Sequence, residues 1–118
     1  MKNFNEEMRI RTKEFALRCI RYADTFKRTD TLRIILNQFI KSATSVAANF
    51  RAACRARSKA EYFSKLCIVI EECDETLFWL EILKEISITN LEENESLRNE
   101  ATELLSIFAT TRKNIKMK

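Results

Sequence analysis

The 118-residue sequence contains no glycine, no proline and no histidine. Hairpin turns and phosphate-binding loops rely on glycine for positive φ angles, and many tight turns rely on proline for a preset φ. The interior of a helix needs neither residue, so the composition predicts an all-α protein. Histidine is the commonest general base and the commonest transition-metal ligand, and its absence argues against sites built on either chemistry.

Long apolar runs are also missing. No stretch of about 18 apolar residues is present, which predicts that nothing spans a membrane. Residues 1–11 are charged and lack the apolar segment of a secretory signal. The four cysteines, at positions 19, 54, 67 and 73, form no Cys-x-x-Cys pair and lie in apolar stretches. We expect reduced thiols packed in a cytoplasmic protein that holds no metal and no cofactor.

What the sequence does have is an uneven charge. The net charge is +4, but residues 1–57 carry 13 Lys and Arg against 5 Asp and Glu, whereas residues 58–118 carry 8 against 12. The first half therefore has a net charge of +8 and the second half −4. Such halves can pair within the molecule, pair between subunits, or leave a basic surface for a polyanion.

Apolar residues recur at helical spacing in four segments. We expect helices over Asn3–Lys27, Thr31–Ala56, Ser58–Glu85 and Asn90–Asn114. The third begins with the capping box Ser58-Lys59-Ala60-Glu61, and Asn90 or Asn94 is the expected cap of the fourth. With short connections, these segments predict one antiparallel up-down-up-down four-helix bundle over residues 1–118.

Each segment carries an apolar stripe that should face the core. In the first segment the stripe runs through Met8, Thr12, Phe15, Cys19, Tyr22 and Phe26. In the third the expected seam is Phe63, Leu66, Ile70, Cys73, Leu77 and Leu80. The third segment also has a second stripe, formed by Ile68, Phe78, Trp79, Ile82 and Ile86. One helix of a monomeric bundle needs only one stripe, so the second one predicts contact with another subunit.

The cations that could bind a phosphate backbone gather near the junction of the second and third segments. The candidates are Arg51, Arg55, Arg57 and Lys59, followed by Arg18 and Arg21 from a first segment that also carries Arg9 and Arg11. The planar guanidinium of arginine matches phosphate or carboxylate in bidentate fashion. No motif that reads bases is visible, so nucleic-acid binding here would depend on shape and charge.

Acidic and polar residues of the middle segments have a structural interpretation. Glu71, Glu72, Asp74 and Glu75 form a cluster of like charge that the basic second segment could neutralise. A carboxylate metal site is the other option for this cluster, without the histidines that di-iron bundles use. Asn49 lies in an apolar stretch of small residues, and we expect it to pair with Glu75 and fix the register of the two helices.

No Ser/His/Asp set, no Cys/His pair and no glycine-rich phosphate loop is present, so we expect no enzymatic activity.

Three stretches of this chain resemble a known family. They are Ser42-Ala43-Thr44-Ser45-Val46-Ala47-Ala48-Asn49-Phe50-Arg51-Ala52-Ala53, Arg57-Ser58-Lys59-Ala60-Glu61-Tyr62-Phe63 and Asp74-Glu75-Thr76-Leu77-Phe78-Trp79-Leu80. They are similar to the bacterial four-helix-bundle family that is also called the 23S rRNA intervening-sequence protein family. The chain departs from the family in two places. The common Asn-Ile-Ala-Glu-Gly run reads Asn49-Phe50-Arg51-Ala52-Ala53, and Glu72 stands where a small residue or serine is usual.

The resemblance implies a left-handed bundle that assembles as a homopentamer with a basic surface or channel. Some members are encoded inside intervening sequences of large-subunit ribosomal RNA genes. A related group serves as accessory proteins of diversity-generating retroelements, which contact a reverse transcriptase and nucleic acid. The family implies structural roles for Asn49 and Glu75 and no known catalysis.

Two main hypotheses of function follow from the sequence. In the first, a cytoplasmic, non-enzymatic homo-oligomer binds RNA or DNA through the basic surface of its first two helices. In the second, the basic and acidic halves meet across subunits, and the assembly is a protein–protein adaptor with no nucleic-acid role. Metal chemistry on the acidic cluster is a third and weaker option.

Overall fold

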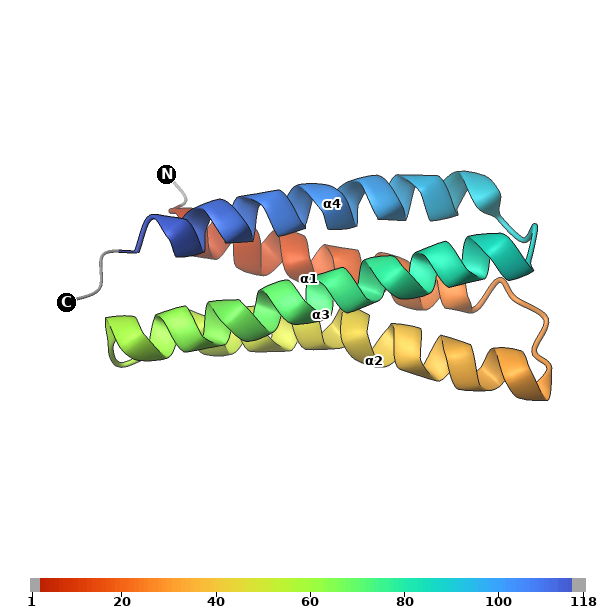
Figure 1. The fold of residues 1–118 in the computed structure, drawn as a ribbon, viewed down its shortest axis with the longest axis horizontal. Coiled ribbons are helices and arrows are strands. Elements are labelled where there is room, and N and C mark those ends of the chain that lie inside the picture. The colour runs from red at the N-terminus through yellow and green to blue at the C-terminus, as the bar shows by residue number, and fades with distance from the viewer. Residues whose placement is uncertain (1–2, 116–118) are drawn as a thin grey trace.

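The computed structural model describes residues 3–115 and shows a rod of four antiparallel helices, about 49 × 28 × 19 Å in extent (Figure 1). The helices are α1 (Phe4–Ala23), α2 (Asp30–Ala53), α3 (Lys59–Ile86) and α4 (Leu91–Lys113). Each helix packs against two neighbours, in the order α1, α2, α3, α4 around the rod. The structure confirms the predicted all-α four-helix bundle.

Short polar residues start three of the four helices. Asn3 Oδ1 accepts from the backbone N–H of Glu6 at 2.8 Å, and Thr29 Oγ1 accepts from Leu32 N–H at 3.2 Å. At the start of α3, Ser58 Oγ accepts from Glu61 N–H at 3.1 Å, as predicted. The Glu61 carboxylate accepts from the backbone N–H of Arg57, not from that of Ser58 as a regular capping box would have it.

The start of α4 differs from the prediction. Asn90 precedes the helix with a φ of 50° and makes no side-chain cap hydrogen bond. Asparagine tolerates this left-handed conformation better than most residues, which suits a chain that has no glycine. Asn94 lies inside the helix and is fully buried, so it is not a cap.

Aromatic and aliphatic side chains of all four helices fill the core. The ring centroids of Phe50 on α2 and Phe108 on α4 are 5.0 Å apart, and those of Tyr22 and Phe39 are 5.9 Å apart. The predicted stripe of α1 is buried along its whole length. Full burial of a large apolar side chain stabilises the fold by about 1.5–3 kcal/mol, so this stripe holds α1 in place.

The seam of α3 is rotated from the predicted one. Val69, Thr76 and Leu83 are buried, whereas Phe63, Ile70 and Leu77 are only partly buried. Thr76 can enter the core because its hydroxyl donates at 2.8 Å to the carbonyl of Glu72 on its own helix, and its oxygen also lies 3.0 Å from Ser42 Oγ on α2. The observed seam shares Leu66, Cys73 and Leu80 with the predicted one but lies on the other side of these three residues.

Candidate nucleic-acid interface

A groove of about 770 Å³ runs between the outer sides of α1 and α2. Arg9 and Lys13 on α1 and Arg51 and Arg55 on α2 line it. Each pair is four residues apart, so the two side chains of a pair project from the same side of their helix. We call this feature the α1–α2 groove. Its floor is apolar and small, formed mainly by Ala16, Leu17, Ile20, Ala47 and Ala48.

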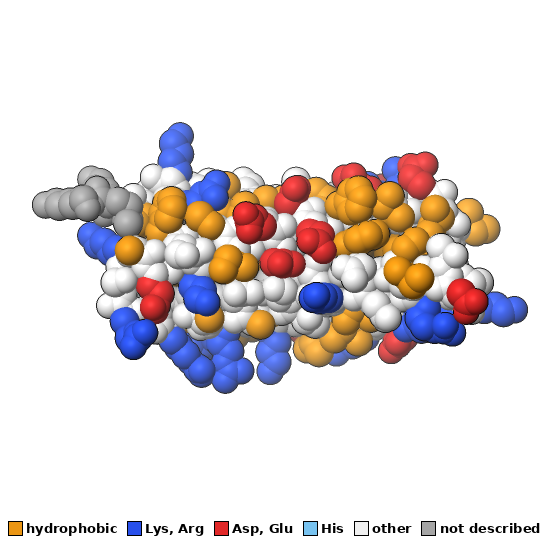
Figure 2. Space-filling view, turned by 60° about the horizontal axis from the view of Figure 1, so that its bottom comes forward, with side chains coloured by type: hydrophobic (Ala, Val, Ile, Leu, Met, Phe, Trp, Pro, Cys, Tyr) orange, Lys and Arg blue, Asp and Glu red, His pale blue; other side chains and the backbone are white. Residues whose placement is uncertain are grey.

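The four cations of the α1–α2 groove are exposed. Within residues 3–115, none of the four forms an ion pair, and no carboxylate lines the groove. Figure 2 shows basic side chains gathered along the lower edge of the molecule. Four cations around one concave surface attract an anion more strongly than the same charges spread over the rod.

Other cations of α1 are already engaged by α4. Arg11 binds both oxygens of Glu100 at 2.8 Å and contacts Glu103 Oε1 at 2.7 Å. These hydrogen bonds to the two carboxylates raise the pKa of Arg11 further above its ordinary value. Arg18 contacts Glu93 at 3.2 Å and Ser96 Oγ at 2.8 Å. Arg18 was a predicted backbone-binding residue, and the structure instead places it in the α1–α4 contact.

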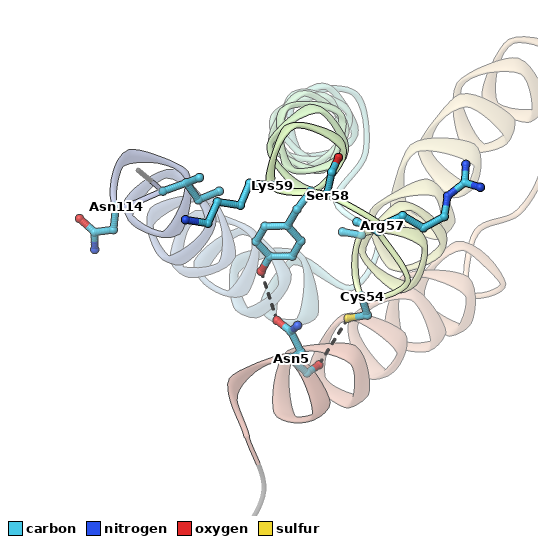
Figure 3. A pocket seen from close by; sticks show the side chains of 10 residues that line it. Asn5, Cys54, Arg57, Ser58, Lys59 and Asn114 are labelled. Carbon is cyan, nitrogen blue, oxygen red and sulfur yellow. Dashed lines mark hydrogen bonds between the residues drawn. The ribbon is translucent and has the colours of Figure 1, made fainter. Parts of the chain in front are cut away.

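The remaining candidates lie at other places. Arg21 is exposed on α1 and contacts Glu14 at 3.5 Å. Arg57 and Lys59 flank the turn between α2 and α3 and line a second recess of about 750 Å³ (Figure 3). Arg57 is 3.8 Å from Glu61, in a pair exposed to solvent that contributes little to stability.

This second recess lies at the end of the rod where α1 begins and α4 ends (Figure 1). Tyr62 donates its hydroxyl to Asn5 Oδ1 at 3.1 Å, and the Cys54 thiol is 3.9 Å from the carbonyl of Asn5. Figure 3 shows these contacts joining the start of α1 to the end of α2 and the start of α3. The recess therefore continues the basic surface from Arg55 toward Arg57 and Lys59.

The acidic cluster of α3 does not neutralise the basic stretch of α2. None of the described ion pairs joins Arg51, Arg55 or Lys59 to a carboxylate of the cluster. Burial and the neighbouring Glu75 and Glu71 raise the pKa of Glu72, and Lys41 partly opposes this shift. Among the described residues, no group of Cys, Asp and Glu side chains is arranged to hold a metal ion.

The predicted pair of Asn49 and Glu75 is wrong for the single chain. The Asn49 amide donates to the Ser45 carbonyl at 3.0 Å and to Ser45 Oγ at 2.8 Å, within its own helix. Glu75 is exposed and accepts from the indole N–H of Trp79 at 3.2 Å. Asn49 satisfies its amide locally, so it needs no partner on α3.

The buried amide that does join helices is Asn94, one of the two predicted caps of α4. Its Nδ2 donates to the Tyr22 hydroxyl at 2.8 Å and to the Leu80 carbonyl at 2.9 Å, and its Oδ1 accepts from Arg98 at 2.8 Å. These bonds connect α1, α3 and α4. The seven-residue spacing of Asn94 from Ala101, and of Ala101 from Phe108, was the available signal that it belongs to the core stripe.

The second stripe of α3 stays accessible in the single chain. Phe78 is 49% exposed and Ile86 is 53% exposed, while Ile68, Trp79 and Ile82 are partly buried. Glu71, Glu72 and Glu75 lie between Ile68 and the aromatic pair at three- and four-residue spacing. We call these eight residues the α3 face. Figure 2 shows acidic side chains gathered near the middle of this side of the molecule, with a larger hydrophobic area beside them.

All four cysteines are free thiols. Burial raises the pKa of Cys19, and it raises the pKa of Cys73 to about 12. Thiols with such raised pKa values stay protonated at neutral pH and are poor nucleophiles.

None of the described helices is both long and apolar enough to cross a membrane.

The fold and this surface define a class, that of small four-helix bundles with an exposed basic groove. Residues 6–110 match the sequence profile of the family described as 23S rRNA-intervening sequence protein. The chain belongs to this family, as the resemblance indicated.

Among solved structures, the chain is similar to a protein with unknown function from the S23 ribosomal protein family of Bacteroides thetaiotaomicron VPI-5482. The TM-score is 0.82 and the sequence identity 30%, over 90% of this chain and 98% of the other. No curated protein matches the chain.

Proposed function

We propose that this protein is a cytoplasmic, non-enzymatic homo-oligomer that binds the phosphate backbone of RNA or DNA. The observation that supports this function is the α1–α2 groove, where Arg9, Lys13, Arg51 and Arg55 have no carboxylate partner among the described residues. Arg57 and Lys59 extend the same basic surface at the end of the rod. Arg18 and Arg21 contribute less, because carboxylates already contact them.

Backbone binding makes a quantitative prediction about salt. Neutralising four phosphates releases condensed counterions, so the logarithm of the affinity for duplex DNA should fall with the logarithm of salt concentration with a slope of about −3.6. For single-stranded RNA the slope should be about −2.8. Between 50 and 200 mM salt, duplex affinity should therefore drop about a hundredfold.

The test compares the wild type with Arg51→Glu, Arg55→Glu by fluorescence anisotropy over a salt series. Losing two phosphate contacts should reduce the duplex slope to about −1.8 and the drop over the same salt range to about tenfold. Lys27→Glu, Lys84→Glu is the matched control, because it changes the net charge equally at exposed positions near the opposite end of the rod. An equal effect of both double variants, or no binding by the wild type at low salt, contradicts the proposal.

The pentamer that the family resemblance implies is part of the same proposal, and the partly exposed α3 face supports self-association. Light scattering at micromolar concentration measures the number of subunits, and a monomer mass contradicts this part.

The second candidate function is a protein–protein adaptor, which the α3 face favours because exposed aromatic patches mark protein contacts. A reverse transcriptase, implied by the related retroelement proteins, is one partner of this kind. An adaptor without a nucleic-acid role binds neither RNA nor DNA at any salt concentration, so the anisotropy series also separates the two functions.

A further inference from the structure

The α1–α2 groove and the recess at the end of the rod share a wall. Cys54, which follows α2, lines both of them. The groove lies on the side of the rod, whereas the lining of the recess comes from this end of all four helices, from Asn5 on α1 to Asn114 after α4. Within residues 3–115, no carboxylate lines either feature. We call the two together the bent path, and its cations are Arg9, Lys13, Arg51, Arg55, Arg57 and Lys59.

The two parts of the bent path offer different chemistry. The groove contributes four cations and, among its lining residues, no aromatic ring. The recess, of about 750 Å³, contributes two cations and the ring of Tyr62. The Tyr62 hydroxyl donates to Asn5 Oδ1 at 3.1 Å, so the partly exposed ring is held in one orientation before a ligand arrives. Proteins that bind single strands combine a basic groove for the backbone with aromatic rings on which bases stack.

We propose that the bent path binds single-stranded nucleic acid, with phosphates along the groove and an unpaired base stacked on Tyr62. This inference rests on the proposed function and names the form of nucleic acid that the same surface prefers. Figure 3 shows Lys59 extending toward Asn114 and Arg57 extending in the opposite direction, so the strand meets a cation on either side of the recess. Arg57 exchanges its exposed contact with Glu61, 3.8 Å long, for a phosphate.

A duplex fits the bent path less well than a single strand. Its persistence length is about 150 bp, so a turn within a few base pairs is costly. Its bases are paired inside the stack, and none reaches Tyr62 unless it is first extruded. A duplex therefore contacts the four cations of the groove, whereas a flexible single strand follows the turn and contacts all six cations of the path.

The dependence of affinity on salt counts these contacts. For a single strand, the groove alone gives a slope of about −2.8, and the whole path gives about −4.2. Arg57→Gln, Lys59→Gln should therefore change the single-strand slope from about −4.2 to about −2.8 and leave the duplex slope at about −3.6. Lys27→Gln, Lys84→Gln is the matched control, because it removes the same charge at the opposite end of the rod and should change neither slope.

Substitutions of Tyr62 test the stacked base. Tyr62→Leu removes the ring and should weaken single-strand binding about tenfold at an unchanged salt slope, because stacking releases no counterions. Duplex binding should not change. Tyr62→Phe keeps the ring and should bind single strands like the wild type. If the phenylalanine variant loses as much affinity as the leucine variant, Tyr62 acts by positioning Asn5, and the stacking is overturned.

A further measurement needs no variant of the protein. One 2-aminopurine is placed at successive positions of an oligouridylate of about ten nucleotides, and its fluorescence should be quenched on binding when it stacks on Tyr62. A strand that binds without quenching at any position overturns the stacked base. Circular dichroism checks that the variants above stay helical.

Fluorescence anisotropy with oligouridylate, oligothymidylate and a mixed-sequence duplex of the same length separates this inference from the proposed function. Tighter binding of either single strand than of the duplex supports the bent path, and comparing the two single strands tells which sugar it takes. Single strands that bind no more tightly than the duplex, with a slope of about −2.8, overturn the bent path and leave the groove as the binding surface. Absence of binding by all three probes at low salt contradicts the proposed function itself.

Discussion

Replacing Asn94 by alanine should destabilise the bundle by about 3 kcal/mol. The side chain is fully buried and makes three side-chain hydrogen bonds, to Tyr22, Leu80 and Arg98. Each such bond contributes about 1 kcal/mol net, and a buried group left without a partner costs about 1–3 kcal/mol. For a chain of this size the loss corresponds to a melting temperature lower by about 12 °C.

Urea unfolding followed by circular dichroism measures this loss, and Tyr22→Phe completes a double-mutant cycle. We expect a coupling energy of about 1 kcal/mol between the two positions, because each single variant removes the same 2.8 Å bond. Asn99→Ala is the control, since Asn99 lies exposed on the same helix. Additive effects, with coupling below about 0.3 kcal/mol, would refute the reasoning that this bond joins α1 to α4.

Two further predictions concern ion pairs and pH. Glu72→Gln should raise the free energy of unfolding at pH 7 by a few tenths of a kcal/mol, since an acid whose pKa is raised in the folded state destabilises the fold as it ionises. This gain in the free energy of unfolding should vanish below about pH 4, where the carboxyl is protonated in the unfolded state as well. Urea titrations at both pH values measure the gain. A lower free energy of unfolding for the variant at pH 7 contradicts the raised pKa of Glu72. Arg11→Lys keeps the charge but loses the two parallel bonds to Glu100, so unfolding should become easier by about 1 kcal/mol. A thermal melt measures this loss, and an unchanged melting temperature would show that lysine reproduces the contact.

The helices themselves could be predicted because several local signals agree. The cap at Ser58 and the stripe of α1 both follow from spacing, and both are present in the structure. The rotated seam of α3 was not predicted, because two seams of equally regular spacing share Leu66, Cys73 and Leu80, and the fold buries the one that runs through Val69, Thr76 and Leu83. Spacing along one helix fits both seams equally well, and the rotation of α3 against its neighbours decides between them.

Some cations of the basic surface can be predicted from spacing along one helix, and others can be identified only from the packing of the helices. Arg51 and Arg55 were predicted from their shared side of one helix. Arg9 and Lys13 were not chosen, although their four-residue spacing was visible, because the sequence does not say which side of α1 meets α2. Arg18 was chosen and faces α4, where Glu93 engages it. Which cations stay free depends on the order of the helices around the bundle.

The even number of antiparallel helices has a practical consequence for handling the protein. The start of α1 and the end of α4 both lie at the end of the rod where α2 turns into α3 (Figure 1), and Asn5 and Ile115 line the same recess as Arg57 and Lys59. A purification tag or fusion partner at either terminus therefore stands beside Arg57 and Lys59, near the mouth of the α1–α2 groove. A polyhistidine or acidic tag would add its own charge to the measured surface, so binding constants should come from cleaved protein or from a label in the connection between α3 and α4 at the opposite pole.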